Sequence, residues 1–426
     1  MSDYVERDLE SCFAGRFCLC LGSGATREFV GDWNTLLGKM LARRVASSLM
    51  AEGMPYATVE KLTVAEAYKA FTHFFSDEGY LEIGEFLLAD DSLEAPERFK
   101  DDLPAWQERI FSRQTEDVIR ESVSESLKRM CPDSSCDAVK PCPLQEDGEH
   151  TLANMYDVYS QTIDSVKSAK ERDCAHLDRY LTTMAVVELC AKKGVQYVVN
   201  YNFDTVVEEM LCETIDSRLV ESRIREIHIW SDGTKTSPQK LISKSNCSVI
   251  LHQGGWSEGI ETLRSNKSIH FFHVHGVVSR FSGLDAECQL VFSQHSYRAY
   301  QNSPYNWGNQ VLQYLLSQFD MVGIGFSGND QNFRHFTSRY AITMLRDFAV
   351  ESRERDVRKR IILVKSKKTH QKAAKDMTGD HEVREHLVEH TTHMIEKYYA
   401  SYYGVQTVWV EDYWEIAKML HDVSNG

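Results

Sequence analysis

The chain has 426 residues, a formal net charge of -15 and 42% hydrophobic residues. This length exceeds one ordinary core and indicates two domains or one enlarged domain, while the hydrophobic share excludes wholesale disorder. The acidic balance argues against non-specific nucleic-acid binding as the main activity, because such binding needs a basic face.

Targeting signals are not evident in the sequence. The first eleven residues lack the basic and then apolar pattern of a signal peptide, and no run of 18 apolar residues predicts a membrane helix. The eleven cysteines are odd in number and scattered, which is typical of reduced thiols. We therefore expect a cytoplasmic protein that does not bind a membrane.

The first elements are a strand and a helix, followed by a long helical region. Residues 16–26 predict a short apolar strand that breaks into a glycine-rich turn, and the periodicity over 33–40 predicts a helix. Residues 56–130 keep a helical pattern, and 130–150 form a loop with three of the eight prolines. An amphipathic helix over 176–194 ends at a glycine.

From residue 195 onward, strands and helices alternate. The segments that begin with a strand are 195–204, 268–276, 289–302, 320–330, 359–366 and 404–412. Their strands are rich in β-branched residues and do not alternate with polar ones, which is typical of a parallel sheet buried on both faces. The sequence therefore predicts an α/β fold, a Rossmann-like parallel sheet with helices on both faces, plus a large helical insertion.

The insertion follows from a gap between the predicted strands. About 170 residues separate the first strand from the next one, far more than an ordinary connection, so this segment must hold its own structure. We expect one Rossmann-like domain from residues 1–37 and 176–426. Residues 38–175 are expected to form a helical insertion domain near or over the site.

The turn at residues 21–26, LGSGAT, is the first candidate binding element. Gly22 and Gly24 permit a sharp turn and close approach of a ligand, and backbone N–H groups there can cradle a pyrophosphate. The third glycine of the dinucleotide fingerprint is absent, because Arg27 follows Thr26. A tight turn between a strand and a helix is the alternative interpretation.

Two further strand ends carry polar residues. Asn202 and Asp204 follow one strand, and the turn VGIGFSGND over 322–330 follows another. Each has a structural alternative, since Asp204 and Asp330 are also suited to cap a helix. In open α/β sheets, ligands bind outside the carboxyl ends of strands, so three such turns predict a nucleotide across this edge.

His273 and His275 lie two apart on a predicted strand and so share a face. Metal ligands, core histidines and a catalytic base are the three alternatives. Zinc needs further ligands, no CxxC pair follows, and the cysteines over 131–142 are irregularly spaced. HLVEH at 386–390 matches an inverted zinc-protease motif but fits a solvated helix face better. No metal is expected.

Taken together, the ordered motifs GSGAT, NFD, HVHG and GFSGND, with VFSQHSYRAY after the histidines, resemble the sirtuin-like family. They are more similar to the bacterial sirtuin-like proteins of antiphage defence than to the protein deacetylases. The resemblance covers residues 16–37 and roughly 195–415. The deacetylases usually carry a four-cysteine zinc module after the His-Gly strand, and only Cys288 lies beyond His275 here, which puts an acyl-peptide groove in doubt.

The resemblance implies roles for individual residues. It implies that Asn202 and His275 are catalytic, and the aromatic residue and aspartate after Asn202 select it over Asn200. His273 is expected to pack or support. NAD is implied as the substrate, bound by its adenosine diphosphate part at Gly22, Ser23, Gly24, Ala25, Thr26, Asp204, Gly325, Ser327 and Asp330.

The implied function is NAD+ hydrolysis to nicotinamide and ADP-ribose, as an effector of bacterial antiphage defence acting by NAD+ depletion. A neutral imidazole is suited to accept a proton near pH 7, and an asparagine amide can hold a water or a ribose hydroxyl. The alternatives are an NAD-dependent protein deacylase and a non-enzymatic subunit that senses NAD or ADP-ribose. The resemblance further implies a homo-oligomer, with a partner ATPase or other defence-system protein.

Overall fold

The structure is a computed structural model. It describes residues 11–30, 35–40, 114–123, 181–232, 238–253, 267–278, 306–348 and 360–426, with shorter stretches and single residues at 9, 42–43, 125–126, 145–146, 149–150, 156, 159, 163, 290–291 and 297–298. No helix within these ranges is long and apolar enough to cross a membrane.

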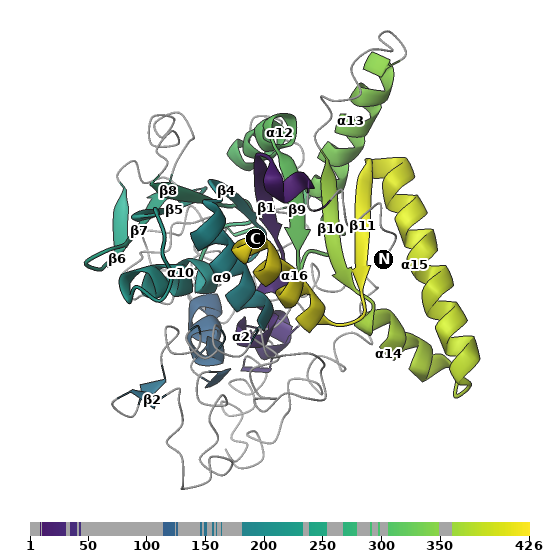
Figure 1. The fold of residues 1–426 in the computed structure, drawn as a ribbon, viewed down its shortest axis with the longest axis horizontal. Helices are drawn as coiled ribbons and strands as arrows, with labels where there is room; N and C mark the ends of the chain where they lie inside the picture. Colours follow the sequence, from purple (N-terminus) through teal and green to yellow (C-terminus); the bar gives the residue numbers. More distant parts are fainter. Residues whose placement is uncertain are drawn as a thin grey trace, which may run out of the picture.

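A nine-stranded sheet forms the centre of the molecule, in the order β11-β10-β9-β1-β4-β8-β5-β7-β6 (Figure 1). All neighbouring strands are parallel except β6, which runs antiparallel to β7 at the edge. This mostly parallel sheet confirms the predicted Rossmann-like α/β fold. The strands are β1 (Phe17–Leu21), β4 (Tyr197–Asn200), β5 (Glu226–Ser231), β6 (Gln239–Ser243), β7 (Ser248–Gln253), β8 (Ser268–His273), β9 (Asp320–Ile324), β10 (Ile361–Ser366) and β11 (Val405–Val410).

Helices cover both faces of the sheet, as predicted. The helices are η1 (Ser23–Ala25), α2 (Arg27–Val30), α9 (Leu181–Lys193), α10 (Val206–Asp216), α12 (Trp307–Gln318), α13 (Gln331–Phe348), α14 (Lys368–Met377), α15 (His381–Tyr403) and α16 (Tyr413–Asn425). Leu19 and Leu21 of β1 pack in one hydrophobic cluster with α9, α10 and α16, whereas Cys18 and Cys20 pack in a second one with α12, α13 and α15. Successive side chains of a strand point to opposite faces, so an unbroken apolar strand supplies both cores.

Helix ends follow the local sequence. α9 ends where Gly194 adopts a φ of 64°, a left-handed conformation that favours glycine, as the sequence predicted. Two helices, α14 and α15, follow β10. Asp380 ends the connection between them, because its side chain accepts hydrogen bonds from the backbone N–H groups of Glu382 and Val383 and so caps α15.

Strands β5, β6 and β7 extend the sheet beyond what the sequence predicted. β7 alternates between buried and half-buried residues, and in β6 only Ile242 is buried, which is typical of an edge and differs from the continuous apolar pattern of the central strands. Most of the predicted insertion over 38–175 lies outside the described residues. Its described parts include a helix over 114–123 and a short antiparallel pair, β2 (Gln145–Glu146) and β3 (Glu149–His150), and the division into two domains stays a prediction.

The turns after β1 and β9 lie against each other. The Gly24 N–H donates to the Gly325 carbonyl oxygen at 2.9 Å, and a Cβ added to Gly24 would lie 2.8 Å from the Gly325 Cα. Gly325 has a φ of 61°, and a Cβ there would overlap the backbone of Ala25. These glycines are therefore required for two turns to pack together.

We predict that Gly325→Ala destabilises the fold much more than Gly194→Ala does. Both glycines have left-handed backbones, which costs about 1 to 2 kcal/mol with any other residue. An added Cβ at Gly194 meets nothing within 4 Å, whereas at Gly325 it meets backbone, which adds about 1 to 3 kcal/mol. Urea denaturation of both variants measures the difference, and equal losses would contradict this account of the two turns.

Candidate functional site

The predicted site residues meet at one edge of the sheet. β9, β1, β4 and β8 are adjacent and parallel, so the turns at their carboxyl ends lie side by side. Hydrogen bonds tie these turns together, since the Gly22 N–H donates to the Ile324 carbonyl and the Tyr201 N–H to the Leu21 carbonyl. This edge is where open α/β sheets bind their ligands.

Asn202 lies at the centre of this edge and is buried. Its Nδ2 donates to the Gly22 carbonyl oxygen at 3.1 Å and to Thr26 Oγ1 at 3.2 Å. A carbonyl oxygen only accepts, so these bonds fix which end of the amide is nitrogen. The Oδ1 atom on the other side is buried and has no hydrogen-bond partner among the described residues. Buried polar atoms are almost always satisfied, so this oxygen is available to a water or a ligand hydroxyl.

Asp204 forms hydrogen bonds both to the turn after β1 and to the start of α10. Its Oδ2 accepts from Thr26 Oγ1 at 2.9 Å, and its Oδ1 accepts from the Val206 N–H at 3.1 Å, at the start of α10. Burial raises the pKa of Asp204 to about 6, with a further contribution from the charge of Glu208, and the hydrogen bond from Thr26 opposes the shift only in part. Thr205, not Asp204, is the N-cap residue of α10, so the predicted capping position is off by one residue. Asp204 still accepts from the first N–H group of the helix and belongs to the Asn202 network.

His275 lies beyond the end of β8 and is also buried. Its Nε2 is 3.1 Å from the Tyr297 hydroxyl and 3.2 Å from Asp330 Oδ2, and the Tyr297 hydroxyl donates to the same carboxylate oxygen at 2.5 Å. Burial alone would raise the pKa of Asp330, but the charge of His275 and hydrogen bonds from His275, Tyr297 and the Phe333 N–H bring it below its usual value. An ionised Asp330 favours the proton on Nε2, which leaves Nδ1 as the acceptor nitrogen of the neutral ring.

Asn200 and His273 belong to a separate, fully buried cluster with Glu208. His273 Nε2 is 2.8 Å from Glu208 Oε1, which also accepts from Asn200 Nδ2 at 3.1 Å. The Asn200 Oδ1 accepts from the Asn202 N–H, and His273 Nδ1 donates to the Asn202 carbonyl. This cluster holds the backbone of Asn202 in place, which fits the supporting role expected for His273.

An aromatic side chain connects the two halves of the edge. The Tyr201 ring lies 5.1 Å from the His275 ring in an edge-on arrangement and stacks on Phe326 at 4.6 Å. Phe326 follows Gly325 in the turn after β9. The position of His275 is therefore coupled by packing to the glycine turns.

Some of the remaining predicted binding residues line a cavity, and the others do not line it. A cavity of about 520 Å³ lies at the edge and is lined by Ser23, Gly24, Gly325 and Ser327 among others. Ala25 and Thr26 are buried behind it, and the Ala25 carbonyl accepts a hydrogen bond from Thr183. Asp330 contacts His275 and caps α13 through its bond from the Phe333 N–H.

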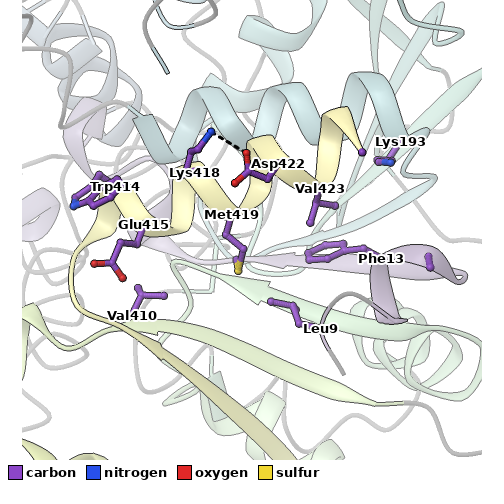
Figure 2. Close-up of a pocket in the computed structure, with 12 residues that line it drawn as sticks. Leu9, Phe13, Lys193, Val410, Trp414, Glu415, Lys418, Met419, Asp422 and Val423 are labelled. Atoms are coloured by element: carbon purple, nitrogen blue, oxygen red, sulfur yellow. Dashed lines mark ion pairs between the residues drawn. The ribbon is translucent and has the colours of Figure 1, made fainter. Parts of the chain in front are cut away.

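A second hollow, of about 640 Å³, lies beneath α16 (Figure 2). Met419 and Val423 of α16 point into it together with Leu9 and Phe13, while the Lys418–Asp422 ion pair lies on the helix. None of the predicted site residues lines it. This hollow is therefore separate from the candidate site at the carboxyl edge of the sheet.

Within the described ranges, no group of three or more His, Cys, Asp or Glu side chains is arranged to hold a metal ion. HLVEH lies on α15, where His386, Glu389 and His390 are exposed or nearly so. The cysteines over 131–142 and Cys288 lie outside the described residues.

Tyr297 and Glu208 form hydrogen bonds in the site and were not predicted. Tyr297 lies in the segment VFSQHSYRAY that carried part of the resemblance, so a tyrosine there was the available signal. Glu208 is fully buried at the start of α10. The available sequence signal was an acidic pair inside the apolar stretch TVVEEMLC. The positions of Tyr297 and Glu208 in the sequence do not predict these contacts, because their hydrogen-bond partners lie in or after other strands.

We predict that the charge of Asp204 lowers the stability of the fold to an extent that depends on pH. Its folded pKa, about 6, exceeds the unfolded value, so the folded state binds more protons between about pH 4 and 6 and stability falls as the pH rises through this window. Relative to Asp204→Asn, the native chain should lose about 2 to 3 kcal/mol from pH 4 to 7. Urea denaturation across this range measures it. The Val207→Ala control titrates nothing and should keep a constant difference, and a constant difference for Asp204→Asn would contradict the burial argument.

Part of the chain is similar to a known protein family. A family model described as SIR2-like domain matches residues 196–376, which include β4, β8, β9, β10 and the turns that carry Asn202, His275 and Asp330. The match covers less than half of the chain and begins after the β1 turn. No curated protein matches the chain. SIR2-like domains use NAD, so residues 196–376 support a sirtuin-like, NAD-related function.

Proposed function

We propose that the chain is an NAD+ glycohydrolase that cleaves NAD+ to nicotinamide and ADP-ribose, with Asn202 and His275 as catalytic residues. The observation that carries the proposal is the buried Asn202 Oδ1 at the carboxyl edge, which has no hydrogen-bond partner among the residues that the structure describes. A ribose hydroxyl or the attacking water supplies the missing donor. The SIR2-like match over 196–376 supports NAD as the substrate.

The charges along the edge orient the substrate. Buried acidic groups at Asp204, Glu208 and Asp330 gather near the ends of β4 and β8, where the cationic nicotinamide ring is favoured. Ser23 and Ser327 line the cavity beside the two glycine turns, and their hydroxyls suit the pyrophosphate. NAD+ thus lies across the edge with its reacting end at Asn202 and His275.

The reaction breaks the bond between the ribose C1′ and the nicotinamide nitrogen. Both electrons of this bond pass to the nicotinamide, which leaves as a neutral molecule, and the ribose passes through an oxocarbenium-like state. A water oxygen forms the new bond to C1′, and its proton passes to the neutral His275 imidazole. The Asp330 carboxylate, 3.2 Å from Nε2, stabilises the resulting imidazolium and receives support from Tyr297.

The cellular role we propose is NAD+ depletion in bacterial antiphage defence, by a homo-oligomer that acts with a partner ATPase or another defence-system protein. It rests on the resemblance of the ordered motifs. Cells that express the native chain should lose NAD+ on phage infection, whereas cells with His275→Ala should keep it. Equal NAD+ levels in the two infected cultures would refute this role.

We predict an order among four variants. His275→Ala should reduce single-turnover nicotinamide release by about 10²- to 10⁴-fold while NAD+ affinity stays within a few-fold, because the imidazole transfers a proton and the turns bind the cofactor. Asn202→Ala should also remove activity. His273→Ala and Asn200→Ala should each lower the stability of the fold by about 1 to 3 kcal/mol and reduce nicotinamide release much less, because each removes a hydrogen-bond partner of the buried Glu208.

The assay measures nicotinamide, ADP-ribose and NAD+ affinity in the assembled protein, with circular dichroism to show that each variant is folded. A parallel reaction with an acetylated peptide separates hydrolysis from deacylation. Release that requires the peptide would favour a deacylase, and binding without release in any assembled state would favour a sensing subunit. If His273 and Asn200 prove to be the essential pair, the roles proposed here are wrong.

A further inference from the structure

The edge cavity next to the glycine turns is basic. Lys365 and Arg334 line it together with His370, and none of the described residues that line it is an aspartate or glutamate. This is unusual for a chain with 63 acidic and 48 basic residues. A cavity that gathers cations without a carboxylate among the described residues is suited to an anionic ligand.

Lys365 lies at the end of β10 and makes no ion pair within the described part of the chain. Its Nζ donates to the Ser327 carbonyl at 2.6 Å and lies 4.3 Å from the centre of the Tyr399 ring. The ammonium group has three donors, so others remain for a ligand. Burial, together with the charge of Arg334, lowers the pKa of Lys365 to about 8. An anion in the cavity would relieve this unfavourable environment.

Arg334 is held in a fixed position by neutral partners. Its Nε donates to the Gly328 carbonyl at 3.0 Å, and its Nη2 donates to Asn329 Oδ1 and to the Tyr399 hydroxyl. The Nη1 group makes no hydrogen bond to a described residue, and the guanidinium has no carboxylate partner there. A guanidinium fixed by neutral groups keeps its full charge for a phosphate.

The position of the cavity identifies which part of a dinucleotide it faces. It spans the carboxyl ends of β1, β9, β10 and β11, whereas Asn202 and His275 follow β4 and β8 on the other side of β1. With strands about 4.8 Å apart, β10 lies roughly 19 Å from β8. Trp409 and Tyr413 line the same cavity and offer aromatic faces for a base. The adenosine half of the substrate therefore belongs here.

We infer that this cavity binds an adenosine ribose that carries a 2′-phosphate, so that the chain binds NADP+ in preference to NAD+. Enzymes that bind an unmodified ribose commonly place a carboxylate against its hydroxyls, and a basic residue takes its place where a 2′-phosphate is bound. Here Lys365 and Arg334 occupy that end of the site, and no carboxylate lines it within the part of the chain that the structure describes. The inference rests on the proposed placement of the dinucleotide across the edge.

The pyrophosphate is the other source of a phosphate, and the experiment separates the two. Isothermal titration calorimetry measures the affinities of the native chain, Lys365→Met and Lys368→Met for NADP+ and NAD+. Lys368 is a matched control, because it lies three residues on, pairs with Asp412 and does not line the cavity. Adenosine 2′,5′-bisphosphate and 5′-AMP serve as fragments without a nicotinamide bond.

The native chain should bind NADP+ at least tenfold more tightly than NAD+, and the bisphosphate more tightly than 5′-AMP. Lys365→Met should remove most of this preference and change NAD+ affinity by less than about threefold, while Lys368→Met should behave like the native chain. Equal affinities of the native chain for NADP+ and NAD+ would overturn the inference. An equal loss of affinity for both dinucleotides in Lys365→Met would also overturn it, because Lys365 would then bind the pyrophosphate. Binding with this preference but without cleavage would refute only the proposed hydrolysis, and cleavage of NAD+ without the preference would refute only this inference.

Discussion

The turns after β1 and β9 approach so closely that neither Gly24 nor Gly325 can carry a side chain. This contact fixes the position of the whole carboxyl edge. The Gly22 carbonyl, held in the first turn, accepts the hydrogen bond that orients the Asn202 amide, whose Oδ1 then has no hydrogen-bond partner within the described ranges. Phe326, in the second turn, stacks on Tyr201, which packs against His275. A small change in the two glycine turns therefore reaches both residues proposed to act on the substrate.

Along this edge the charge changes from acidic to basic. Asp204, Glu208 and Asp330 are buried near the ends of β4 and β8, while Lys365 and Arg334 line the cavity at the ends of β9 and β10. A dinucleotide with a cationic nicotinamide at one end and phosphates towards the other matches this gradient. In the proposed function, this gradient sets the direction of the dinucleotide, and Asn202 and His275 lie at the bond that is cleaved.

The sequence predicted those features that depend on one segment at a time. Each central strand with its polar or glycine-rich turn was predicted, and so was the parallel arrangement that brings Asn202, His275 and Asp330 to one edge. The contact between Asp330 and His275 was not predicted, because it depends on the order of β8 and β9 in the sheet. β5, β6 and β7 were not predicted. β6 and β7 have half-exposed residues and lack the apolar pattern of the central strands, whereas β5 is mostly buried but carries Glu226, His228 and Ser231 among its apolar residues. The break between α14 and α15 depends on Asp380, whose capping bonds interrupt an otherwise continuous helical pattern.

The most direct test of the account is a crystal structure of the full chain with ADP-ribose bound. The account predicts that a ribose hydroxyl, or a water beside it, donates to Asn202 Oδ1 and that the pyrophosphate lies beside Ser23 and Ser327. The adenosine should lie in the cavity near Lys365, with no bound group in the hollow beneath α16. ADP-ribose bound beneath α16, or bound at the edge with Asn202 Oδ1 still unpartnered, would contradict the central claim.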